Sequence, residues 1–165
     1  MVSRIVRLAL AALLGTALIA MASPAQAADT RVTITFKAQL ANVSNNTSTF
    51  GDLQYGTTTL QGASLVKGEE VLVRRDSVVE YVDGTGPIGG FLTVTWKDGS
   101  RISMRVAGSG VKASERTDFT ANLDVFSTAG RWKGYVGHGI MRGVRDGDLG
   151  APVIYTYRVT LTRIG

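Results

Sequence analysis

The chain has 165 residues, with 18 Lys or Arg, 13 Asp or Glu and a formal net charge of +5. It contains no cysteine, which excludes both disulfide bonds and a lipid anchor attached through cysteine. The basic residues form no run and no basic helix, so the sequence does not predict nucleic-acid binding.

The first 27 residues have the pattern of a secretory signal peptide. Arg4 and Arg7 precede an apolar run over residues 8–22, and small residues up to Ala27 end in an Ala-x-Ala site. The run is shorter than the roughly 20 apolar residues of a membrane-spanning helix. We therefore expect cleavage after Ala27, no membrane span in the mature chain, and a secreted or periplasmic protein. The remaining residues, 28–165, carry a net charge of +3 and suffice for one domain.

The first half of the mature chain predicts strands separated by polar segments. Apolar and polar residues alternate over 31–40, whereas residues 42–49 are polar throughout and predict a surface loop. In the third segment Arg75, Asp76 and Ser77 interrupt a β-branched run, which predicts a bulge or a break. The expected strands of this half are 31–40, 53–60 and 69–82.

Residues 88–110 give the clearest hairpin. A two-residue loop would bring apolar and polar residues opposite each other on one face. A three-residue loop at 97–99, with Gly99 in a left-handed conformation, pairs Val94 with Ile102 and keeps the apolar residues together. We therefore expect the three-residue loop.

The last third of the chain is rich in glycine. Glycines recur in the second of its strands, and glycines inside strands are typical of the sharp bends of a barrel. A loop is expected at 144–151. With seven or eight strands and no helical period after residue 28, the fold class is all-β, as a closed antiparallel barrel or, alternatively, a two-layer sandwich. The expected strands here are 118–127, 133–142 and 152–163.

Three segments resemble those of a known superfamily. They are Asp83–Leu92, with its repeated glycines, the hairpin Ser127–Gly137, and the closing strand Val153–Leu161. Over about residues 83–163 the chain is similar to the allene oxide cyclase and dirigent-protein barrels. The resemblance implies a calycin-like single closed antiparallel β-barrel of about eight strands, often trimeric, with an apolar cavity. Plant members cyclise an unstable fatty-acid epoxide or direct the coupling of phenoxy radicals, but no catalytic residue of either matches here.

Two motifs favour structural over chemical roles. Residues 84–89 read Gly-x-Gly-x-x-Gly, but they contain Pro87 and precede a strand, whereas a dinucleotide site requires a helix there. We expect a turn and no cofactor. His138 is the only histidine, and no spacing of carboxylates around it predicts a metal site. If its side of the strand faces the interior, it could act as an acid or base; the alternative is a surface histidine or a core histidine with its hydrogen bonds satisfied.

Two functions remain open from the sequence. One is binding of a small hydrophobic molecule in a barrel cavity of about 300 Å³ or more, with or without cofactor-free isomerase or cyclase activity. The other is a non-catalytic structural or interaction role in the cell envelope, with a barrel filled by side chains. Catalytic residues stay unassigned. The candidate ligand-binding residues are Tyr81, Trp96, Arg105, His138 and Tyr157.

Overall fold

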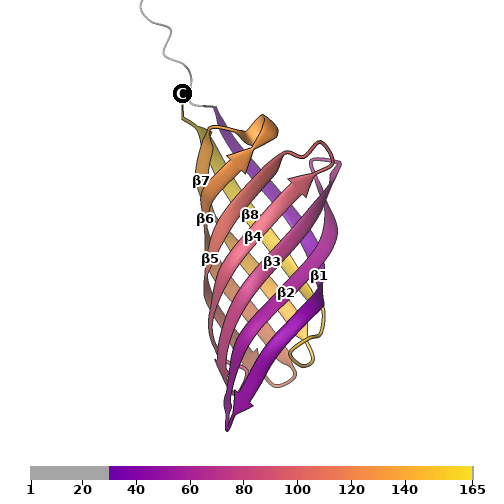
Figure 1. Cartoon of the computed structure of the whole chain (residues 1–165), viewed down its shortest axis with the longest axis vertical. Helices are drawn as coiled ribbons and strands as arrows, with labels where there is room; N and C mark the ends of the chain where they lie inside the picture. Colours follow the sequence, from indigo (N-terminus) through magenta and orange to yellow (C-terminus); the bar gives the residue numbers. More distant parts are fainter. Residues whose placement is uncertain (1–29, 165) are drawn as a thin grey trace, which may run out of the picture.

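A computed structural model describes residues 30–164, which form one closed antiparallel β-barrel (Figure 1). Each strand pairs with the next in sequence, and β8 closes the barrel against β1. The predicted closed barrel is confirmed, and the two-layer alternative is wrong. The predicted signal peptide lies outside the described residues. The elements are β1 (Arg31–Phe50), β2 (Leu53–Val66), β3 (Glu69–Val82), β4 (Gly86–Trp96), β5 (Arg101–Ala113), β6 (Arg116–Ala129), the 3₁₀ turn η1 (Gly130–Trp132), β7 (Tyr135–Asp146) and β8 (Val153–Arg163).

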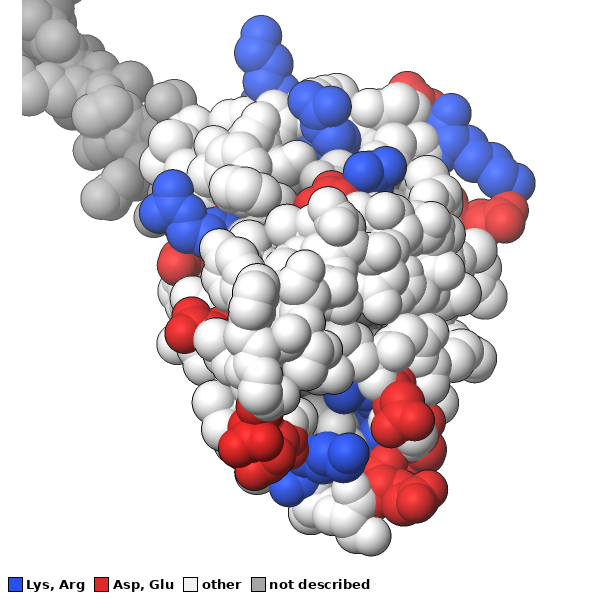
Figure 2. Space-filling model, turned by 60° about the horizontal axis from the view of Figure 1, so that its bottom comes forward, with Lys and Arg blue, Asp and Glu red and all other residues white. Residues whose placement is uncertain are grey.

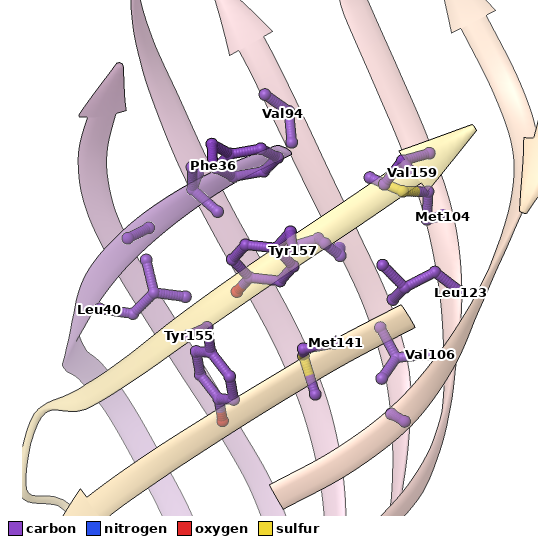
Figure 3. Close-up of a cluster of buried hydrophobic side chains, with 14 of the residues drawn as sticks. Phe36, Leu40, Val94, Met104, Val106, Leu123, Met141, Tyr155, Tyr157 and Val159 are labelled. Carbon is purple, nitrogen blue, oxygen red and sulfur yellow. The ribbon is translucent and has the colours of Figure 1, made fainter. Parts of the chain in front are cut away.

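Alternating side chains fill the interior of the barrel. In β1, for example, Ile34, Phe36, Ala38 and Leu40 are buried, while the residues between them are exposed. Side chains from β1, β4, β5, β6, β7 and β8 meet across the lumen (Figure 3). This apolar filling occupies the middle of the barrel. Its largest fully buried members are Tyr81, Tyr155, Tyr157, Leu40, Leu92, Met104, Leu123, Met141 and Leu161.

A glycine in β7 makes room for a large tyrosine of β8. Gly143 faces the neighbouring Tyr155, and a Cβ atom at Gly143 would lie 2.3 Å from the Cδ1 atom of that ring. Such a contact is far below van der Waals distance, so a side chain here would displace the ring. The absence of a side chain at Gly143 is therefore what allows the Tyr155 ring to lie in this position inside the lumen.

The β4–β5 hairpin has the predicted geometry. Val94 pairs with Ile102, and Gly99 adopts a left-handed φ of +81°. The backbone N–H of Trp96 donates to the carbonyl of Ser100 at 2.9 Å, which closes the loop. The prediction of a three-residue loop is confirmed.

The predicted loop at 42–49 is wrong, because β1 continues to Phe50. A register shift between Asn42 and Ser44 starts a ribbon in which these polar residues pair with β2. The ribbon extends to the tip of the molecule (Figure 1). Backbone pairing with β2 stabilises a strand that buries few side chains, and for this reason the apolar pattern did not show it. The partner strand is likewise longer than the predicted 53–60.

Two further predictions, a bulge and a loop boundary, were wrong, and both concern residues that line the interior of the barrel. The bulge predicted at residues 75–77 does not occur: β3 keeps an uninterrupted register with β2 and with β4 through this segment. The loop predicted at 144–151 begins later, since β7 runs through Asp146. Because the alternation is unbroken, Arg75, Ser77 and Arg145 all point into the barrel.

Candidate functional site

The two ends of the barrel differ in how they are closed. At the end that we call the covered end, η1 packs against the barrel (Figure 1), and its Trp132 lies against Trp96 with ring centroids 5.3 Å apart. The Arg131 guanidinium lies over both indoles and pairs with Glu69 at 2.6 Å. The opposite end, which we call the mouth, carries the turns that join β1 to β2, β3 to β4, β5 to β6 and β7 to β8.

Two arginines are buried just inside the mouth. Arg75 of β3 is 2% exposed and Arg145 of β7 is 5% exposed. Each occupies an inward position of its strand, where the preceding and following inward residues are apolar or small. Burial of a guanidinium is costly, because the group keeps its positive charge and loses its hydration.

Aromatic rings position both guanidinium groups. The Arg75 group lies 5.1 Å from the ring centroid of Tyr155, and the Arg145 group lies 5.5 Å from that of Phe119. The two rings are themselves neighbours, with centroids 5.9 Å apart. Arg75 donates to the Tyr155 hydroxyl through Nη1, and Arg145 donates to the Thr117 hydroxyl at 3.2 Å. These contacts hold both positive charges in one region of the lumen.

No carboxylate within residues 30–164 forms an ion pair with either arginine. All buried polar or charged residues of that range other than the two arginines are Ser or Thr, and its ion pairs lie elsewhere, on the surface. Several buried polar atoms of this region also have no hydrogen-bond partner among the described residues. These atoms are Nε and Nη2 of Arg75, Nε of Arg145 and Oγ of Ser77.

A small cavity lies beside the arginine pair. Its lining includes Arg75, Ser77, Tyr81, Arg145 and Tyr155, and the space open to the centre of a water molecule is about 20 Å³. That is room for one water-sized group. Outside it, a wider basin of about 490 Å³ shares Arg145 with the cavity and reaches the molecular surface. Figure 2 turns this end of the barrel towards the viewer and shows acidic and basic side chains gathered there.

The tyrosines around the cavity are held in their neutral form. Burial raises the pKa of Tyr81 to about 12, with a further contribution from nearby Tyr155. Burial likewise raises the pKa of Tyr155 and of Tyr157 above the ordinary value. At neutral pH these residues therefore present hydroxyl groups and add no negative charge. The site is electropositive and contains neutral hydrogen-bond donors, a combination suited to an anion.

The predicted site residues are distributed over four places. Tyr81 lines the cavity, and Tyr157 lies deeper in the lumen, stacked on Phe36 at 4.7 Å. Trp96 lies at the covered end. Arg105 and His138 are exposed on the outer face, so neither side chain reaches a ligand inside the barrel. The prediction grouped residues that the fold separates.

The sequence pattern did not predict that Arg75, Arg145 and Tyr155 form a group. A signal for Arg75 was present, because it has the same strand parity as the apolar residues Val73 and Val79. The interruption of the apolar run was interpreted as a bulge instead of as a charged residue in the interior. Nothing comparable marked Arg145, because the glycines two residues before and after it favour a loop.

Nowhere in residues 30–164 do three His, Asp or Glu side chains come close enough together to hold a metal ion. The same residues contain no helix with the length and apolar character needed to span a bilayer.

Comparison with known proteins found no matching family model, no matching curated protein and no matching solved structure. Membership of the allene oxide cyclase and dirigent superfamily therefore stays a prediction. The site must be interpreted from its own geometry.

Proposed function

We propose that this protein is a binding barrel that takes up a small anion, or the carboxylate head of a small organic acid, between Arg75 and Arg145. The observation that carries the proposal is the pair of buried guanidinium groups with which no carboxylate of the described chain forms an ion pair. Leaving a buried charge unpaired costs several kcal/mol, on the order of 3–5. A bound anion would remove that cost for both arginines at once.

The hydrogen-bonding geometry supports an oxyanion. A guanidinium presents a rigid fork of N–H donors that matches the two oxygens of a carboxylate. Arg75 retains two unpartnered nitrogens, and Arg145 retains one. Ser77 adds an unpartnered hydroxyl, and Tyr81 stays protonated near the same cavity. These groups provide donors from β3 and β7 to one anion.

The proposal retains small-molecule binding, as expected from the sequence, but changes the ligand. A hydrophobic molecule inside the lumen needs a cavity of about 300 Å³ or more, whereas the cavity beside the arginines is about 20 Å³. Only a head group fits there, and the body of a ligand would occupy the outer basin. An isomerase or cyclase activity stays a prediction from the resemblance alone.

Titration of the purified protein with formate or acetate tests the proposal. We expect saturable binding by isothermal titration calorimetry. The free energy of unfolding should rise by about 2.7 kcal/mol at a ligand concentration of 100 times Kd. The double variant Arg75→Met/Arg145→Met should lose both effects.

A matched control is Arg105→Met, which removes the same charge from the outer face and should bind like the wild type. Equal stabilisation of the wild type and the double variant would show that the anion acts elsewhere. An absence of binding to the wild type would contradict the proposal and favour a structural role with a filled barrel.

A further inference from the structure

The basin outside the arginine cavity has the opposite charge. Its rim carries Asp52 from the β1–β2 turn, Asp83 from the β3–β4 turn and Asp148 from the β7–β8 loop. The rim has one basic residue, Lys112 of β5, and Arg145 lies where the basin meets the cavity. Anything that enters the cavity from this side therefore passes three carboxylates.

The three rim carboxylates are exposed, and none forms an ion pair with another residue in the described range 30–164. A ligand that is only an anion would be attracted by the buried arginines and repelled by this rim. A ligand that carries a positive group beyond its acid group would be attracted by both. The order of charges, positive inside and negative outside, thus distinguishes between classes of organic acid.

We propose that the ligand is a small zwitterion, with its carboxylate between Arg75 and Arg145 and its ammonium group in the basin, facing Asp52, Asp83 and Asp148. This inference rests on the proposed function, because the arginine pair must first hold the acid group. The cavity admits one water-sized group, so the chain between acid and amine lies in the basin. The chemical class is a free amino acid of low molecular weight.

Two matched ligand series test this inference by calorimetry on the purified protein. The zwitterions are glycine, β-alanine, γ-aminobutyrate and δ-aminovalerate; the acids of the same chain lengths without the amine are acetate, propionate, butyrate and valerate. For at least one chain length we expect the zwitterion to bind about fivefold more tightly than its acid, the effect of exposed ion pairs. The chain length of the zwitterion that binds most tightly then indicates the spacing between the arginine pair and the rim carboxylates.

Charge-neutral variants of the rim assign the effect to these residues. Asp52→Asn/Asp83→Asn/Asp148→Asn should bind each zwitterion no better than its matched acid, while its affinity for the acids is retained or increased. Each single Asn variant should lose part of the preference, which keeps the test usable if the triple variant folds poorly. Asp124→Asn on the outer face is the control and should keep the full preference.

The outcomes separate this inference from the proposed function. If the acids bind to the wild type as tightly as the zwitterions at every chain length, the zwitterion inference is overturned and the anion site stands. If the amine preference persists in the triple variant, the rim is not its source and the inference is likewise overturned. If neither series binds to the wild type, both proposals fall.

Discussion

The covered end and the mouth of the barrel use arginine in contrasting ways. In both places the guanidinium lies over an aromatic ring, at 5.2 Å for Arg131 over Trp96 and 5.1 Å for Arg75 over Tyr155. At the covered end the side chain of Arg131 is 39% exposed and has Glu69 as its partner. At the mouth Arg75 and Arg145 are buried and have no carboxylate partner among the described residues.

The contrast is the reverse of what stability alone would favour. A partly exposed guanidinium is hydrated and gains little from a carboxylate, whereas a buried one needs a counter-charge most. The chain places a carboxylate, Glu69, beside the partly exposed Arg131, where an ion pair contributes less to stability. We infer that Arg131 at the covered end is neutralised by Glu69 of the same chain, and that the two buried arginines at the mouth receive a direct counter-charge from outside the chain.

The largest effect is expected where the covered end is packed. Trp96→Ala should lower the free energy of unfolding by about 3–5 kcal/mol, because it removes a buried indole and its contacts with Trp132. Chemical denaturation followed by circular dichroism measures this loss. Phe91→Ala, at an exposed position, is the control and should lower the free energy of unfolding far less. A loss below about 1 kcal/mol for Trp96→Ala would mean that the covered end is not part of the core.

Alkaline pH should lower the free energy of unfolding through Tyr81, which lines the cavity at the mouth. Below pH 10 the Tyr81 hydroxyl is protonated in both the folded and the unfolded chain; between pH 10 and about 12 only the unfolded chain releases the proton. This residue should therefore contribute a loss of about 2–3 kcal/mol across that interval. Denaturant unfolding at a series of pH values, with Tyr81→Phe for comparison, measures it. Parallel pH curves for the two proteins would contradict the assigned pKa.

Removal of one buried charge should stabilise the protein when no anion is present. Arg75→Met replaces an unpaired guanidinium by an apolar side chain and should raise the free energy of unfolding by about 1–3 kcal/mol in anion-poor buffer. Adding formate should make the wild type the more stable of the two proteins, because only the wild type is stabilised by binding it. If Arg75→Met is the less stable protein in both buffers, the contacts of Arg75 with Tyr155 outweigh the cost of its charge.

The smallest effect is expected at the paired arginine of the covered end. Glu69→Gln removes the charge partner of Arg131, but both side chains are partly exposed, so the change should be below about 1 kcal/mol. Denaturant unfolding at low and at high salt tests this, and the difference should shrink as salt rises. A large, salt-independent loss would remove the contrast between the two ends.

The sequence predicted the parts of the fold that depend on apolar alternation and turn chemistry. The closed barrel and the β4–β5 loop with its left-handed Gly99 are of this kind. It did not predict the polar half of β1, which is held by backbone pairing with β2 and buries few side chains. Patterns of side chains carry no signal for a strand of that kind.

The site was less predictable than the fold, for a physical reason. Charged residues normally lie outside, so Arg75 was interpreted as a break in β3, and Arg145 was assigned to a loop. Their burial is understandable only once the barrel brings β3, β6, β7 and β8 together around Tyr155 and Phe119. His138 shows the converse, because it shares strand parity with the apolar residues Val136 and Ile140, yet that face of β7 lies outside. Arg105 lies between the inward residues Met104 and Val106, and its alternation with them already indicated the outer face.

The most direct test is a crystal structure of the protein soaked in bromide, whose anomalous scattering identifies the ion. Bromide fits a water-sized cavity and needs only positive charge and hydrogen-bond donors. We predict an anomalous peak within contact of both Arg75 and Arg145, which is absent from Arg75→Met/Arg145→Met crystals. A cavity that holds only water, with bromide bound solely on the outer surface, would contradict the claim that these two arginines form an anion site.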